Sequence, residues 1–161
     1  YAGMIWLFGP GKYDHLMLAL KHHRKGGGGA HCWLVMRDTA PVKEAFSGLA
    51  ADVAALAPSV ALHPFYINEL DTDATYSAVH DILTREVVEV GLGTREVISD
   101  ITGGVKPMTT GMALAALALN TAIEYVESDR DADGWPIPGT EHVVALDLNF
   151  EVSRGEATRG A

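Results

Sequence analysis

The most informative part of this sequence is the stretch Asp100-Ile101-Thr102-Gly103-Gly104-Val105-Lys106-Pro107-Met108. It ends an apolar, β-branched run (95–101) and opens an alanine-rich run with helical character, so a strand meets a helix at two glycines. Glycine lets backbone N–H groups approach a ligand closely, and a helix N-terminus favours anions. The stretch therefore predicts an anion-binding loop, which we call the cradle (residues 100–108). A tight turn capped by Thr102 would explain the glycines, but it explains less well why Thr102, Lys106 and Thr109 cluster around them.

Strands and helices are predicted to alternate on both sides of this cradle. The predicted strands are 2–8, 31–36, 60–67, 95–101, 123–126 and 143–150, and the predicted helices are 13–25, 41–56, 74–90 and 107–121. Regular alternation implies right-handed crossovers and a mainly parallel sheet covered on both faces. No helix separates the last two strands, so we expect them to pair antiparallel across the polar loop 129–140. The predicted fold is α/β, a Rossmann-like three-layer sandwich with a mainly parallel six-stranded sheet and an antiparallel strand at the C-terminal end.

Size and composition fit one globular domain. The chain has 161 residues, of which 48% are hydrophobic and 20% charged. We expect one domain over 1–150 and a flexible C-terminal tail at 151–161. The single cysteine, Cys32, excludes an internal disulfide and any multi-cysteine metal site, and fits a reducing compartment such as the cytoplasm. The longest apolar run, Met112–Leu119, is far shorter than the roughly 18 residues that span a bilayer.

The net charge of −9 argues against DNA or long RNA as a partner. Its distribution is uneven, because residues 1–68 carry six Lys or Arg against four acids, whereas residues 69–161 carry six against 17. A polyanionic ligand is compatible with this balance only at a local site made of amides and a few cations. The candidate cations are Lys12, Arg37 and Lys106.

Fold logic places the cradle in a crevice. In open α/β sheets, ligands bind beyond the carboxyl ends of the strands, where the strand order reverses. For a 3-2-1-4-5-6 order this point lies between the first and fourth strands. The loop 9–11 and the cradle residues 102–104 are then expected to face each other across one crevice.

Named nucleotide-binding motifs do not fit. A P-loop needs a glycine five positions before its Gly-Lys pair and a Ser or Thr after it. Around Gly11-Lys12, these places hold Trp6 and Tyr13. A dinucleotide fingerprint would need a third glycine where Asp14 stands. These departures make an NAD or ATP enzyme a weak alternative.

No metal or cofactor is predicted either. His22 and His23 are adjacent, so they project about 100° apart on a helix. The run 129–134 resembles the start of a calcium loop, but Thr140 stands where the final glutamate is expected. A solvated turn is the better interpretation there. Asp71 is interpreted as a turn or N-cap residue before the helix that starts near Ala74.

The cradle resembles a known family. The stretch 100–108, the alanine-rich helix and then Glu124-Tyr125-Val126 are similar to CARF domains, the CRISPR-associated Rossmann-fold sensors of cyclic oligoadenylate. The fourth strand of that family typically ends in Asp-x-Thr-Gly-Gly-Thr-Lys-x-Met. Eight of these nine positions are compatible here, counting the two variable ones, and Val105 replaces the usual threonine. The element order resembles the family over 2–150, whereas the specific match covers the cradle and the helix after it.

This resemblance implies a homodimer in which two cradles and two first-strand loops bind one ring, usually cyclic tetra-adenylate and sometimes the hexamer. By motif position, it places in the binding loop Thr102, Gly103, Gly104, Lys106 and Met108, with Thr109 beside them. By position in the fold, we add Gly9, Pro10, Gly11 and Lys12 after the first strand, Arg37, Asp38 and Thr39 after the second, and Asn68 after the third. No catalytic residue is assigned.

The resulting expectation is a sensor in type III CRISPR antiviral defence that allosterically controls an effector segment absent from this chain. An N-terminal segment, in some family members a membrane-spanning one, is the more natural place for that effector, and would put the domain at the inner membrane face. The first alternative is a ring nuclease that degrades cyclic tetra-adenylate. The second is a small nucleotide-dependent enzyme or regulator on a Rossmann-like scaffold.

Overall fold

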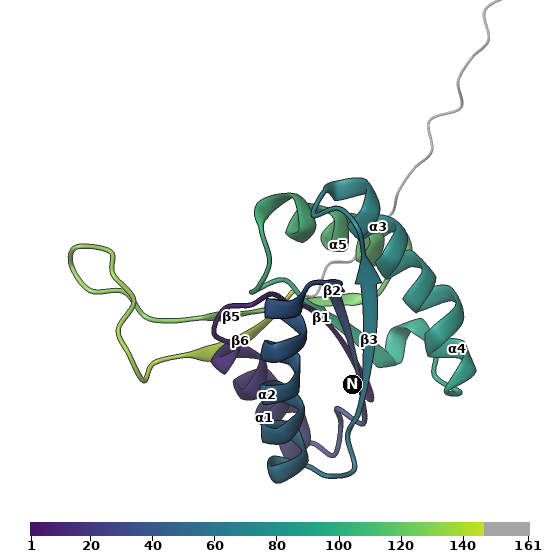
Figure 1. Ribbon diagram of the computed structural model, residues 1–161. Coiled ribbons are helices and arrows are strands. Elements are labelled where there is room, and N and C mark those ends of the chain that lie inside the picture. Colours follow the sequence, from purple (N-terminus) through teal and green to yellow (C-terminus); the bar gives the residue numbers. More distant parts are fainter. Residues whose placement is uncertain (147–161) are drawn as a thin grey trace, which may run out of the picture.

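The computed structural model describes residues 1–146, in which strands and helices alternate as predicted (Figure 1). The strands are β1 (Gly3–Leu7), β2 (His31–Arg37), β3 (Ala61–Ile67), β4 (Val97–Asp100), β5 (Ala122–Glu127) and β6 (His142–Leu146). The helices are α1 (Asp14–Lys25), α2 (Ala40–Leu56), α3 (Thr72–Asp81), α4 (Val87–Glu89) and α5 (Lys106–Ala118), with a π-helical turn η1 (Ile82–Glu86) between α3 and α4. The end of the predicted strand 143–150 and the predicted tail 151–161 lie outside the described residues.

The strand order is β3-β2-β1-β4-β5-β6, which confirms the predicted reversal between the first and fourth strands. Neighbouring strands are parallel except β5 and β6, which pair antiparallel. The α/β Rossmann-like prediction is therefore confirmed, including its antiparallel C-terminal strand. Because β1, β4 and β5 run in one direction, their carboxyl ends meet at one side of the sheet, which we call the carboxyl edge.

Helices cover both faces of the sheet. Figure 1 shows α1 and α2 on one side and α3, α4 and α5 on the other. Side chains alternate between the faces of a strand, so Met4 and Trp6 pack with α1 and α2, whereas Ile5 and Leu7 pack with α3 and α5. All four are buried. Strand β1 is thus enclosed on both faces, as its apolar sequence predicts.

The helix after β3 begins earlier than the predicted residue 74. Asp71 caps it, because its Oδ1 accepts a hydrogen bond from Ala74 N at 2.7 Å, and α3 starts at Thr72. Helix α5 ends at Ala118 rather than at 121, because Asn120 adopts a left-handed φ of 53°. Short polar side chains tolerate this conformation better than most residues do.

Strand β4 is shorter than the predicted 95–101. Residues Thr94–Glu96 form a 3-10 turn instead of extended chain. The Glu96 carboxylate accepts a hydrogen bond from Gly93 N at 2.8 Å, and Glu96 N donates to Gly93 O at 2.9 Å. This local pairing satisfies the backbone before the strand enters the sheet, although the side chains alone are typical of a strand.

Helices α3 and α5 cross in close contact at Gly111. A Cβ at this position would overlap Thr72 O and lie 2.9 Å from Tyr76 N. Met112 and Ala115 of α5 are fully buried in the core beside this crossing. Any larger residue at 111 would separate the two helices, so α3 and α5 form a single packed unit.

A hairpin arm, residues 128–141, connects β5 to β6 and extends away from the layered body (Figure 1). Asp131 closes its turn, because its Oδ1 accepts hydrogen bonds from Asp133 N at 3.0 Å and Trp135 N at 2.9 Å. Arg130 donates to Gly134 O at 2.8 Å. The arm is therefore held by its own hydrogen bonds. Since it follows the carboxyl end of β5, it projects past the carboxyl edge.

None of the helices formed by residues 1–146 combines the length and the apolar character that a membrane-spanning segment needs.

Candidate functional site

Three hollows lie along the carboxyl edge. The apolar pocket encloses about 340 Å³ beyond the ends of β1, β2 and β4. The glycine pocket encloses about 120 Å³ and shares Phe8, Gly9 and Gly104 with the apolar pocket. The arm pocket encloses about 480 Å³, shares Lys12 and His15 with the glycine pocket, and reaches the base of the arm. Because neighbouring hollows share walls, we treat them as one groove at the predicted switch point.

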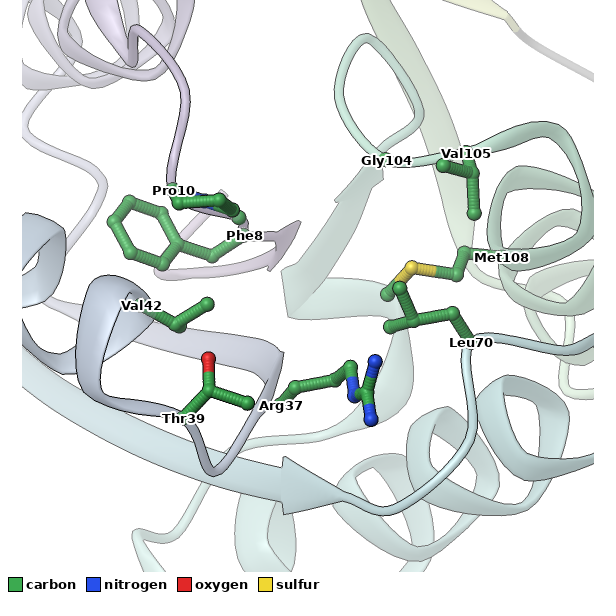
Figure 2. Close-up of a pocket in the computed structure, with 10 residues that line it drawn as sticks. Phe8, Pro10, Arg37, Thr39, Val42, Leu70, Gly104, Val105 and Met108 are labelled. Carbon is green, nitrogen blue, oxygen red and sulfur yellow. The ribbon is translucent and has the colours of Figure 1, made fainter.

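The apolar pocket combines apolar walls with a single cation. Its apolar walls are formed by Phe8, Pro10, Val42, Leu70, Val105 and Met108. Figure 2 shows the Arg37 side chain extending from the end of β2 toward Leu70 and Met108. Arg37 is exposed and forms no ion pair within residues 1–146. Such walls suit a flat aromatic base, and the guanidinium suits a phosphate beside it.

The cradle glycines are required by the packing of the loop on β1. Gly104 has a left-handed φ of 84°, and a Cβ there would lie 2.8 Å from Leu7 Cδ1. A Cβ on Gly103 would lie 2.9 Å from Leu7 O and 3.1 Å from His15 Nε2. No side chain caps α5, whose N-cap residue is Val105. The glycines thus serve the turn, while Lys106 and Met108 offer the amides of the uncapped first turn of α5 to an anion and Pro107 between them offers none.

Two threonines that we predicted in the ligand site hold the loop in place. Thr102 does not cap α5, because its Oγ1 accepts a hydrogen bond from Val126 N at 2.7 Å. Thr109 Oγ1 donates to Gly103 O at 3.3 Å. Both hydroxyls are therefore engaged by the backbone. The third polar member of the cluster, Lys106, is exposed at the start of α5.

A buried carboxyl group fixes the start of the loop. Asp100 is 1% exposed, its Oδ1 accepts a hydrogen bond from Thr102 N at 2.7 Å, and its Oδ2 has no partner within residues 1–146. It lies beside Glu124 on β5, which is fully buried and 2.7 Å from His23 Nε2. Burial raises the pKa of Asp100 to about 6, although the hydrogen bonds from Thr102 oppose the rise. Asp100 therefore takes up a proton just below neutral pH.

His15 of α1 faces the glycine pocket. Its Nε2 atom is buried and has no hydrogen-bond partner in the described part of the chain. Burial lowers the pKa of His15, while the nearby Asp14 opposes this. The imidazole is consequently neutral near pH 7. Sequence reasoning passed over His15 because it stands apart from other candidate residues.

Nine of the fourteen predicted site residues line the groove, and their contact with a ligand stays a prediction. These nine are Gly9, Pro10, Gly11, Lys12, Arg37, Thr39, Gly103, Gly104 and Met108. Besides Thr102, Thr109 and Lys106, two more lie outside its lining. Asp38 forms an exposed ion pair with Lys43, and Asn68 is exposed beyond the end of β3.

Several groove residues were not predicted from the sequence. They are Phe8, Tyr13, His15, Val42, Leu70 and Val105. Most are apolar, and apolar residues next to predicted strands and helices are typical of a core. Their position along the chain could have indicated the groove, because Phe8 ends the first predicted strand and Leu70 follows the third predicted strand by a few residues.

The fold and the groove define a Rossmann-like α/β domain with a ligand cleft at its switch point. No protein-family model matches the sequence, and neither does any curated protein. Solved structures do share the fold. Can2 from Sulfobacillus thermosulfidooxidans, in complex with cyclic tetra-adenylate, is 15% identical with a TM-score of 0.56, over 80% of this chain and 33% of that one.

Two further structures are similar. A type III CRISPR defence DNA nuclease activated by cyclic oligoadenylate is 17% identical with a TM-score of 0.56, over 80% of this chain and 19% of that one. Enterococcus italicus Csm6, bound to cyclic hexa-2′-fluoro-hexa-dAMP, is 14% identical with a TM-score of 0.63, over 89% and 42%. The chain thus spans less than half the length of each. The TM-scores show a common fold, and it is the fold implied by the resemblance to CARF domains.

Proposed function

We propose that this domain is a sensor that binds a cyclic oligoadenylate, cyclic tetra-adenylate first among the candidates, across a homodimer. In this proposal, it acts in type III CRISPR antiviral defence and controls an effector segment outside this chain. It would act in the cytoplasm, or at the inner membrane face where a membrane segment precedes it. The observation that carries the proposal is the groove, because a fold shared with cyclic-oligoadenylate complexes here presents apolar walls, a cation and an open helix N-terminus together.

The chemistry of the groove supports a nucleotide ring. Adenine is flat and largely apolar on its faces, and the apolar pocket offers Phe8, Pro10 and Met108 as walls. Phosphates carry the charge, and Arg37, Lys12 and the amides of α5 lie at the same edge. One groove meets only part of a ring, so a two-fold pair of grooves would present the same contacts twice.

Calorimetry tests the proposal directly. The protein is titrated with cyclic tetra-adenylate, cyclic hexa-adenylate and linear tetra-adenylate, and its mass is followed by sedimentation. We expect one cyclic ring bound per two chains and weaker binding of the linear form. Absence of binding to either ring at micromolar concentration would overturn the proposal and favour a nucleotide-dependent enzyme or regulator on the same fold.

Ring cleavage is a second candidate function, favoured by one observation. The unpartnered Nε2 of His15 lies in the glycine pocket, where a proton acceptor beside a ribose hydroxyl would assist its attack on phosphate. Incubation with cyclic tetra-adenylate, followed by chromatography for linear products, separates sensor from nuclease. Products that disappear in both His15→Ala and Lys106→Ala would establish cleavage; an intact ring after prolonged incubation would exclude it.

A further inference from the structure

The tip of the arm presents an exposed tryptophan. Trp135 is 71% exposed, the most of any large hydrophobic side chain within residues 1–146, and Ile137 beside it is 38% exposed. Both backbone N–H groups are engaged, Trp135 N by Asp131 Oδ1 at 2.9 Å and Ile137 N by Asp129 O at 2.8 Å. The arm thus holds an indole in solvent on a preorganised backbone. A single exposed apolar residue is ordinary, but an indole held at the end of a projecting hairpin suits an interface, where tryptophan is enriched.

The direction of the arm identifies the surface that it meets. The arm follows β5, whose carboxyl end lies at the same edge as those of β1 and β4, and the groove opens at this edge. The arm base already borders the groove, because Val126 and Glu141 line the arm pocket together with Lys12. In a dimer with facing grooves, each arm therefore points toward the second copy.

Charge complementarity supports a second copy of this chain as the partner of the arm. The arm, residues 128–141, carries four acidic residues and one basic residue, Arg130. The carboxyl edge carries exposed Lys12, Arg37 and Lys106, none of which forms an ion pair within the described residues. An acidic arm that ends in an indole matches this edge, where Lys106 lies outside the groove lining and stays available to the arm when phosphates of a ligand occupy Lys12 and Arg37.

We propose that the arm of each chain clasps a second copy of this chain, and that Trp135 closes the partner's groove over the bound ligand. The site is then incomplete in one chain, because the partner contributes the aromatic lid. This inference rests on the proposed function for the identity of the ligand, whereas the contact between copies is measurable without it. A two-fold arrangement makes the contact occur twice.

Tryptophan fluorescence provides the test, since Trp6 and Trp33 are buried at 0% and 1% exposure while Trp135 is exposed. Acrylamide quenching of the full chain is compared at low and high protein concentration, with and without cyclic tetra-adenylate, and Trp135→Phe isolates the signal of the arm. We expect Trp135 to be quenched freely in the monomer and to be protected in the dimer. Equal quenching of Trp135 in monomer and dimer would overturn the proposal.

Two variants extend the test. Trp135→Ala is expected to weaken both dimerisation and cyclic tetra-adenylate binding by about tenfold or more, and Trp135→Phe, which keeps an aromatic face, to retain most of both. Val88→Ala is the matched control, because Val88 is 61% exposed on α4, far along the chain from the arm. Dimer and ligand affinities that are unchanged in Trp135→Ala would contradict the arm contact.

The two proposals fail in different ways. If the chain binds cyclic tetra-adenylate while Trp135 stays exposed to the quencher, the arm contact is wrong and the proposed sensor function is unaffected. Conversely, protection of Trp135 in a dimer that binds no cyclic oligoadenylate supports the arm contact and overturns the proposed ligand.

Discussion

Thr102 Oγ1 accepts a hydrogen bond of 2.7 Å from Val126 N, which ties the glycine cradle to the strand that leads into the arm. The two residues are 24 positions apart, and the bond joins the ends of β4 and β5 at the carboxyl edge. A single hydrogen bond therefore connects the cradle directly with the base of the arm.

Removing this acceptor should loosen the cradle. Thr102→Val leaves Val126 N without its partner, so we expect a loss of about 1 to 2 kcal/mol in the free energy of unfolding and weaker ligand binding. Urea unfolding and calorimetry measure the two effects. Thr110→Val is the control, because its exposed hydroxyl donates only to Lys106 O within its own helix. Equal changes in stability and ligand affinity in the two variants would show that the hydrogen bond from Val126 N contributes to neither.

Asp100 should make stability depend on pH. Its pKa is raised from 3.8 to about 6 in the folded protein, so the folded state binds the proton more tightly than the unfolded state does. The resulting stabilisation is fully present below about pH 4 and is lost as the pH rises through 6. Asp100→Asn keeps an oxygen to accept from Thr102 N and removes the charge. Above pH 7, we expect this variant to be more stable than the parent by about 2 to 3 kcal/mol.

Urea unfolding between pH 4 and 8 checks this expectation. Glu44→Gln serves as the control, because Glu44 is an exposed carboxylate on α2. The difference between the parent and Asp100→Asn should grow with pH, while that for Glu44→Gln stays flat. A constant difference for Asp100→Asn would mean that this carboxyl group titrates normally.

Gly104 should be intolerant of any side chain. In Gly104→Ala, the left-handed φ of 84° and the 2.8 Å approach to Leu7 Cδ1 combine, so we expect a loss of at least about 1 to 2 kcal/mol. Gly11→Ala is the matched control in the same groove, since a Cβ there meets nothing within 4 Å. Thermal unfolding measures both. Equal melting temperatures would contradict the packing argument.

Arg37 should contribute charge to ligand binding and little to folding. Arg37→Met keeps the length of the side chain, so we expect binding of cyclic tetra-adenylate to weaken about tenfold or more, with a smaller dependence on salt concentration. Stability should change by less than about 0.5 kcal/mol, because the side chain is exposed. Arg85→Met removes an exposed arginine from η1 as the control. An equal loss in both variants would indicate a general effect of net charge.

Sequence reasoning reached the sheet order and the place of the groove because strand alternation and the switch-point rule depend on patterns along the chain. It could not assign the hydroxyls of the cradle. Whether Thr102 faces a ligand or the backbone depends on Val126, which is remote in sequence and is brought near only by the pairing of β4 with β5. The shortened β4 was missed for a similar reason, since the turn at Thr94–Glu96 depends on a hydrogen bond to Gly93 rather than on side-chain pattern.

The contact at Gly111 joins the two helices that stand behind one wall of the groove. Gly111 brings α3 and α5 into close contact, and Leu70 just before α3 and Met108 in the first turn of α5 line the same wall of the apolar pocket. The opposite wall includes Val42 of α2, which packs on the other face of the sheet. A ligand bound in the apolar pocket would therefore touch both helical layers of the domain at once.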